Sequence, residues 1–307
     1  MIKSRLAFLD PVLLARLRKN PRFTSLKMRL RTRLQAMQAA DVVAVAPGKA
    51  VKANGDHEMV VASYNIHKCV GTDGRFDPGR IAAVIAELDA DVVAIQEADK
   101  RFGRRQGLLD LKALEKQTNL SLIPTSEQAD GHGWHGNALL LRKGKVRDMR
   151  RLSLPSAEPR GALVVDLDLP AGPLRLVAAH LGLLRRSRRW QVRSILDAIG
   201  EGPRMPTLLV GDFNEWRPGR KSSLHELRPV FGPLVHAHFS FPSYFPVIAL
   251  DRVIGSPGLV TAMEVHDSDL ARVASDHLPL KATIDIPAAQ KEMRGHEDEL
   301  VVSEVGG

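Results

Sequence analysis

The sequence predicts an α/β fold whose sheets are mixed or antiparallel. Short apolar runs of strand length outnumber the amphipathic helical segments. Several of these runs follow one another without a helix between them, which a doubly wound parallel sheet does not allow. The chain of 307 residues is long enough for one large domain or two modest ones, and either can bury a full core.

The expected elements begin at residue 59. Strands are expected at 59–66, 91–96, 137–141, 161–169, 174–180, 207–210, 250–254, 260–265 and 278–286. A helix is expected to begin at Pro78 with Asp77 as its N-cap, because an Asp followed by Pro at the first helical position is a typical helix start. Further helices are expected at 108–116 and 187–199.

Composition excludes several classes of protein. Hydrophobic residues make up 44% and charged residues 26% of the chain, which excludes wholesale disorder and collagen-like repeats. The single cysteine, Cys69, cannot form an internal disulfide, so a disulfide framework of the secreted kind is excluded. No apolar run reaches the roughly 18 residues of a membrane-spanning helix.

The net charge of +9 belongs entirely to residues 1–40, which hold ten basic residues and one acidic residue. The remaining 267 residues carry equal numbers of acids and bases. Within this arm Leu26, Leu30, Leu34 and Met37 form one stripe at helical spacing, so a basic amphipathic segment is predicted. A solvated extension, a helix on an anionic membrane surface and an arm for nucleic acid are three competing interpretations.

The arm is followed by a linker, a globular domain and a tail. Residues 41–58 read as the linker, and residues 59–287 form the expected domain. Residues 288–307 are rich in acids and are expected to be a disordered C-terminal tail.

Polar residues interrupt the apolar pattern at the ends of the predicted strands. These interruptions are Y-N-I-H at 64–67, Q-E at 96–97, A-H-L at 179–181, G-D-F-N at 211–214, L-D-R at 250–252 and S-D-H-L-P-L at 275–280. Side chains at strand ends are held by a rigid scaffold while they still reach a cleft. Carboxylates and amides in such a group suit a hard divalent cation, and histidines can stabilise charge on a phosphoryl oxygen.

Each of these groups alone has an ordinary structural explanation. A G-D-F-N sequence is typical of a turn after a strand, and an isolated histidine is more often a core residue. The pair His132 and His135 lacks the partners of a zinc site. Only the complete ordered set makes a structural explanation improbable.

The ordered set resembles the endonuclease/exonuclease/phosphatase (DNase I-like) superfamily of divalent-metal phosphoesterases over residues 59–287. The motifs N-I-H-K, H-G-N-A, H-L-G-L and G-D-F-N-x-W-R resemble those of a bacterial branch of that superfamily. The resemblance implies a four-layered sandwich, in which two mixed β-sheets pack face to face and helices cover their outer sides.

The resemblance also implies a role for each motif residue. Glu97 is expected to hold the catalytic Mg²⁺, with Mn²⁺ as an alternative, and Asn65 and Asp276 are expected near the ion. Asp212 is expected to position and deprotonate the attacking water with help from Asn214.

The remaining motif residues are expected to act on the phosphate. His277 would contact the scissile phosphate and be oriented by Asp251. His180 and Asn137 would donate to the phosphate oxygens.

Departures from the superfamily pattern bear on the substrate. Abasic-site nucleases carry an acid where this chain has His67, which disfavours that activity. His135 stands near the position where many members have a tyrosine. Arg185 opens the basic helix after the strand that ends at His180, and the other arginines of that helix are expected to form a solvated face. We therefore treat His67, His135 and Arg185 as candidate substrate contacts.

An aromatic segment at 239–245 concentrates four aromatic residues just before Asp251. Core packing is the ordinary explanation for such a run. An apolar lip beside the metal site is the functional alternative, suited to a lipid, to an aromatic leaving group or to stacking on a base.

The sequence predicts a Mg²⁺-dependent hydrolase that acts on a phosphodiester, with a phospholipid or small phosphodiester favoured over DNA or RNA. The electrically balanced body favours the first class, because binding to duplex nucleic acid usually needs a broad basic face. A scaffold without catalysis is a third hypothesis, which the complete set of carboxylates disfavours. No obligate protein partner is implied. The expected location is cytoplasmic, at the inner face of the membrane if residues 1–40 bind lipid.

Overall fold

The computed structural model describes residues 57–100, 103–156, 158–217, 219–234 and 238–305, together with Ser25 and Met28. The predicted basic arm and linker therefore lie outside the described residues, apart from Ser25, Met28, His57 and Glu58. Among the described residues, no helix is both long and apolar enough to cross a bilayer.

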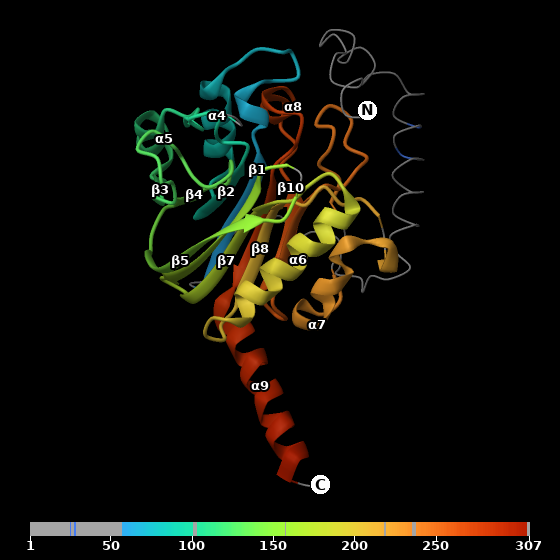
Figure 1. Cartoon of the computed structure of the whole chain (residues 1–307). Coiled ribbons are helices and arrows are strands. Elements are labelled where there is room, and N and C mark those ends of the chain that lie inside the picture. Colours follow the sequence, from blue (N-terminus) through green and yellow to red (C-terminus); the bar gives the residue numbers. More distant parts are fainter. Residues whose placement is uncertain are drawn as a thin grey trace.

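The described chain forms two β-sheets that pack face to face (Figure 1). The first sheet has the strand order β10-β11-β1-β2-β4-β3, and the second has the order β5-β6-β7-β8-β9. The first sheet contains β1 (Glu58–Asn65), β2 (Val92–Gln96), β3 (Ser121–Leu122), β4 (Ala138–Leu141), β10 (Val260–Val265) and β11 (Leu280–Asp285). The second contains β5 (Lys145–Leu154), β6 (Arg160–Leu169), β7 (Gly172–His180), β8 (Thr207–Asp212) and β9 (Asp251–Gly255).

Helices cover the outer side of each sheet (Figure 1). The first sheet is covered by α4 (Pro78–Leu88), α5 (Leu111–Thr118) and α8 (Asp269–Ala274), and the second by α6 (Arg185–Gly200), η3 (Ser223–Leu227) and α7 (Arg228–Phe231). Two shorter 3-10 turns, η1 (His67–Cys69) and η2 (Gly219–Lys221), lie in loops.

Three hydrophobic cores lie between these layers and hold them together. The central core joins the sheets, because side chains such as Val61 and Ala94 from the first sheet meet Leu176 and Leu208 from the second. The two outer cores lie between each sheet and its helices. The arrangement is the four-layered α/β sandwich that the resemblance implied, and that expectation is confirmed.

Both sheets are mixed, as the run of consecutive strands predicted. In the first sheet β1 runs parallel to β2, and in the second β7 runs parallel to β8, while the other pairs are antiparallel. Helix α4 begins where expected, since the Asp77 side chain accepts a hydrogen bond from the Arg80 amide and Pro78 occupies the first helical position.

Among the elements that were not predicted, β5 and α8 lack a strong apolar pattern. The edge strand β5 is mostly exposed or half-buried and reads K-V-R-D-M-R-R-L-S-L. An edge strand with one solvated side needs few apolar residues, and charges along it are common. The short helix α8 is only six residues long and depends on the Ser268 cap.

The C-terminal tail differs from the expected disorder. Helix α9 spans Ile286–Val305 and extends away from the sheets (Figure 1). Its first turn is stabilised because Ile286 and Ala289 are fully buried, and because Asp285 accepts a hydrogen bond from the Ala288 amide. The helix therefore begins on buried residues at the end of the expected domain and continues into residues 288–305, which were expected to be disordered.

Candidate active site

The strand register aligns the polar strand ends at one end of the two sheets. In the second sheet His180 pairs with Asp212, and Asp212 pairs with Asp251 across three neighbouring strands. In the first sheet Asn65 pairs with Gln96, so that Glu97 follows directly beside it. These residues are distant in the chain and adjacent in space because each lies at or next to a strand terminus at the same end of the two sheets.

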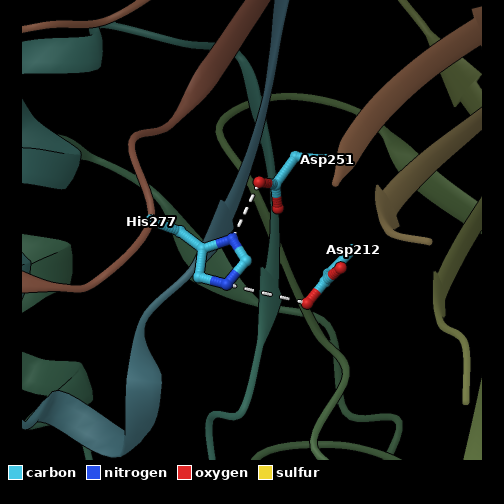
Figure 2. Close-up of side chains that lie close together, drawn as sticks. All are labelled: Asp212, Asp251 and His277. Carbon is cyan, nitrogen blue, oxygen red and sulfur yellow. Dashed lines mark hydrogen bonds and ion pairs between the residues drawn. The ribbon is translucent and has the colours of Figure 1, made fainter. Parts of the chain in front are cut away.

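A histidine–aspartate pair lies at the centre of the site (Figure 2). His277 Nδ1 lies 2.8 Å from Asp251 Oδ2, and His277 Nε2 lies 3.8 Å from Asp212 Oδ2. Burial opposes the charge on the imidazole, but Asp251, Asp276 and Asp212 outweigh it and raise the pKa of His277 to about 9. The ring is therefore protonated at neutral pH.

Asp212 is fully buried and its two oxygens have different partners. Oδ1 accepts a hydrogen bond from the Asn214 amide at 2.9 Å, and Oδ2 accepts one from Asn65 Nδ2 at 3.0 Å. The Asn214 side chain donates to the Leu181 carbonyl, which holds the loop after β8 against the end of β7. Asn214 has a φ of 50°, a left-handed conformation that Asn adopts more readily than most residues. The carboxylate is thus held firmly in place between the two sheets.

His180 approaches the same Asp212 oxygen as His277. The His180 Nε2 atom is 3.4 Å from Asp212 Oδ2 and 2.9 Å from Arg160 Nη1. Arg160 is buried and also donates to Glu158. Sequence reasoning missed Arg160, because an arginine at the start of a strand carries no signal of a partner that is 20 residues away.

Glu97 accepts a hydrogen bond from the Lys68 ammonium group. Burial would raise the pKa of Glu97, but His180 and Lys68 outweigh burial and lower the pKa to about 2. Lys68 lies in η1, where His67, Lys68 and Cys69 have φ values of 45°, 54° and 61°. Three consecutive non-glycine residues in the left-handed region cost energy, and strain of this kind is concentrated at functional sites.

Several oxygen atoms of the site are buried without a hydrogen-bond partner. Among the described residues these include Asp251 Oδ1, Asp276 Oδ1 and Asn137 Oδ1. Asp276 Oδ1 lies 3.9 Å both from His277 Nε2 and from His67 Nδ1. Unpartnered carboxylate oxygens among carboxylates and amides suit a hard cation.

A second grouping could also hold a metal ion by its geometry. One ligand atom each from Asp212, Asp251 and His277 lie within 4.8 Å of one another. A protonated His277 that is bonded to Asp251 has no free lone pair at Nδ1, and its proton would compete with a metal. The carboxylates at this end of the sheets are therefore better suited to the ion than the imidazole.

Asn137 is used differently from the expected phosphate donor. Its side-chain Nδ2 donates to the Trp134 and Gly161 carbonyls, so both amide hydrogens bind the backbone. Its expected contact with phosphate would require these bonds to break, and that role stays a prediction.

The candidate substrate contacts have different environments. His67 Nδ1 lies 2.9 Å from the Val70 carbonyl and faces Asp276. His135 packs edge-on against Trp134 with a ring distance of 4.7 Å, and burial and Arg105 lower its pKa.

Arg185 is exposed in the first turn of α6. His132 is a structural residue, because its Nε2 accepts a hydrogen bond from the Leu109 amide.

Three of the four aromatic side chains in the segment before Asp251 are buried, and the fourth, Phe245, is half-buried. Phe239, Phe241 and Tyr244 are each at most 7% exposed. The Phe241 ring lies 4.8 Å from the His277 ring, and the Ser240 hydroxyl donates to Asp251. The segment therefore contacts both members of the histidine–aspartate pair and helps to position them.

Comparisons with known proteins identify the family of the chain. A family model described as the Endonuclease/Exonuclease/phosphatase family matches residues 62–277. The Uncharacterized protein YbhP of Escherichia coli K12 is 31% identical over 243 residues, which cover 73% of this chain and 95% of that protein.

Solved structures with lower identity share the fold. A Beutenbergia cavernae endonuclease/exonuclease/phosphatase is 22% identical with a TM-score of 0.55, covering 75% of this chain and 72% of its own. A mannosyl-6-phosphatase of Bacteroides thetaiotaomicron is 18% identical with a TM-score of 0.57, and the match covers 74% of this chain and 99% of that protein's chain. The D. rerio protein TDP2 in complex with a single-strand DNA product is 18% identical with a TM-score of 0.55, and the match covers 75% of this chain and 99% of that protein's chain.

Proposed function

Because the chain belongs to the endonuclease/exonuclease/phosphatase family, we propose that it is a divalent-metal-dependent hydrolase of a phosphodiester, either a phospholipid or a small soluble diester. The observation that carries this proposal is the position of Asp212. This buried carboxylate lies within 4 Å of the imidazoles of both His180 and His277, and Asn65 and Asn214 hold it.

Asp212 is placed to orient a water molecule and accept its proton. A carboxylate that is held by two hydrogen bonds needs no rearrangement when the reaction begins. The protonated His277 next to it donates a hydrogen bond toward the phosphoryl oxygens and stabilises the negative charge that develops there. Asp251 keeps the imidazole ring charged and in this orientation.

Glu97, Asn65 and Asp276 would hold Mg²⁺, with Mn²⁺ as the alternative. The unpartnered Asp276 Oδ1 and the ionised Glu97 supply the oxygen ligands that such ions prefer. When bound, the ion supplies positive charge that neutralises the phosphoryl oxygens and favours attack on phosphorus. Asn65 connects this group to Asp212, because its side chain donates directly to that carboxylate.

Turnover of a soluble diester in the presence of Mg²⁺ tests the proposal. The purified protein is expected to hydrolyse bis-p-nitrophenyl phosphate with Mg²⁺ and to lose this activity when EDTA is added. Asp212→Asn is expected to lose this turnover, and Asp197→Asn is its matched control, because Asp197 is an exposed carboxylate on the outer helix α6. A protein without any EDTA-sensitive turnover would be a scaffold of the kind considered above, and the proposal would be wrong.

The same preparation separates the substrate classes. Phospholipid vesicles, plasmid DNA, RNA and the monoester p-nitrophenyl phosphate are each offered with Mg²⁺. Preferential hydrolysis of DNA or RNA would establish the nuclease alternative and exclude the proposed substrate class. Hydrolysis of the monoester alone would make the protein a phosphatase.

A further inference from the structure

Exposed leucine and tryptophan side chains lie next to the catalytic end of the second sheet. Leu183 and Leu184 are 50% and 63% exposed, and Trp190 and Trp216 are each 47% exposed. We name this region the Leu–Trp–Arg surface. It consists of Leu183, Leu184, Arg185, Arg186, Trp190 and Trp216.

The surface is close to the site in the chain as well as in space. Leu183 follows His180 by three residues, so at most about 11 Å of extended chain separates them. Trp216 follows Asn214 by two residues. A substrate bound at this surface would therefore be adjacent to the Asp212 carboxylate.

A buried arginine holds the two loops of the surface together. Arg188, which was expected on a solvated face, is only 1% exposed. Its guanidinium donates to the Gly182 and Leu183 carbonyls and also to the Glu215 carboxylate, one residue before Trp216. Leu183 and Trp216 are thus presented by a rigid framework and are not on a loose loop.

The local sequence is poor for the stability of helix α6. Leu184 is the N-cap and provides no side-chain hydrogen bond, whereas Ser, Thr, Asp or Asn would stabilise that end. The first turn has no acidic residue and contains Arg185 and Arg186, which the positive end of the helix dipole disfavours. Apolar and cationic residues at these positions need an explanation other than folding.

We propose that the Leu–Trp–Arg surface binds an anionic phospholipid bilayer and presents a lipid phosphodiester to the active site. Leucines and tryptophans next to arginines match the boundary between acyl chains and headgroups, since apolar side chains enter the bilayer and cations meet anionic phosphates. The Arg186 guanidinium lies 4.9 Å from the centroid of the Trp190 ring, which keeps the cation beside the apolar group. Two exposed leucines favour lipid over nucleic acid, because bases stack on aromatic rings and gain little from leucine.

Quenching of tryptophan fluorescence by brominated lipids tests the surface directly in the full chain. Vesicles of phosphatidylcholine and phosphatidylglycerol with bromine on the acyl chains are expected to quench Trp190 and Trp216. The Trp190→Phe/Trp216→Phe variant is expected to lose this signal. Because quenching reports insertion of these side chains, binding through residues 1–40 does not by itself produce it.

Leucine variants provide the matched comparison. Leu183→Glu/Leu184→Glu is expected to lower vesicle binding at least tenfold and abolish quenching, and Leu183→Ser/Leu184→Ser is the milder form. Each of Arg185→Ala and Arg186→Ala is expected to weaken binding about fivefold, since a cation near an anionic surface contributes about 1 kcal/mol. Val146→Glu is the control, because Val146 is 41% exposed on β5 at the opposite end of the same sheet.

The lipid substrate is tested by turnover, and this part rests on the proposed function. Leu183→Glu/Leu184→Glu is expected to lower kcat/KM for vesicle phospholipid at least tenfold while leaving hydrolysis of bis-p-nitrophenyl phosphate unchanged. Quenching without any turnover of the soluble diester would support the surface and contradict the proposed function. Hydrolysis of the diester without quenching would overturn the proposed lipid-binding surface. Quenching that persists in Leu183→Glu/Leu184→Glu would also overturn it. Quenching by a single-stranded oligonucleotide but not by vesicles would also overturn it and indicate a nucleic-acid surface.

Discussion

His277 Nδ1 lies 2.8 Å from Asp251 Oδ2, although the two residues are 26 positions apart in the chain. Asp251 begins β9 of the second sheet, and His277 lies just before β11 of the first sheet. Both side chains are nearly inaccessible to solvent. The Asp251 carboxylate therefore acts on the imidazole without screening by water, and it keeps the ring charged at neutral pH.

The pH dependence of activity is expected to follow His277. Because its pKa is raised to about 9, the protonated ring persists through neutral pH, and kcat/KM for a soluble diester should fall as the pH rises through about 9. Asp251→Asn removes the main stabilising charge and should move this alkaline fall to lower pH. A pH profile of the two proteins checks this, with Asp197→Asn as the control. An unchanged profile in Asp251→Asn would show that Asp251 does not control the charge of His277.

The same pair is expected to contribute to stability in a defined pH window. A histidine whose folded pKa lies above its ordinary 6.5 stabilises the fold fully below that value and loses the contribution as the pH rises through about 9. Urea denaturation of the wild type between pH 6 and pH 10 should show this loss. Asp251→Asn should show a smaller dependence over the same window, and an equal dependence would contradict the assignment.

Asp212→Asn is expected to lower kcat for bis-p-nitrophenyl phosphate by about 10²–10⁴-fold, the usual range for loss of a general base. The amide oxygen can still accept the bond from Asn65 or Asn214, so the fold should be retained. Circular dichroism and steady-state kinetics check both statements. Activity close to that of wild type would remove Asp212 from the proposed chemistry.

Lys68→Met is expected to tighten the binding of Mg²⁺ or Mn²⁺. The Lys68 ammonium binds Glu97, so a metal ion must displace it, and the half-exposed pair implies an effect of about two- to fivefold in Kd. Isothermal titration with the metal alone measures this without any substrate. Lys221→Met is the control at an exposed lysine on the outer loop η2. Equal or weaker affinity in Lys68→Met would contradict competition at Glu97.

Asp166→Ala is expected to lower the free energy of unfolding by about 3–5 kcal/mol, the usual cost of leaving one buried charge without its partner. Arg175 is 1% exposed and donates two bonds of 2.7 Å to Asp166. Asp168 lies on the same strand as Asp166 and forms an exposed ion pair with Arg147. Asp168→Ala should therefore lower the free energy of unfolding by at most about 1 kcal/mol. Urea denaturation distinguishes the two variants, and similar values would show that burial does not decide the cost.

Most of the sheet could be predicted because its signals are local. The apolar runs that became β1, β7 and β8 carry their pattern within a few residues, and Asp77 with Pro78 marks the start of α4 by itself. The edge strand β5 could not be predicted, since its stability comes from pairing with β6 and not from its own composition.

The sequence by itself determined which strand ends carry polar residues, and hence that Asp212, Asp251 and His277 belong to one candidate site. Only the tertiary structure decided that Arg160 reaches His180, that Lys68 binds Glu97 and that Asn137 donates to backbone carbonyls. It also decided that the aromatic segment 239–245 is largely buried while Leu183 and Trp216 are exposed. The physical reason is that a strand's pattern depends on neighbours in the chain, whereas burial and partner choice depend on what the other sheet and its loops bring to the same place.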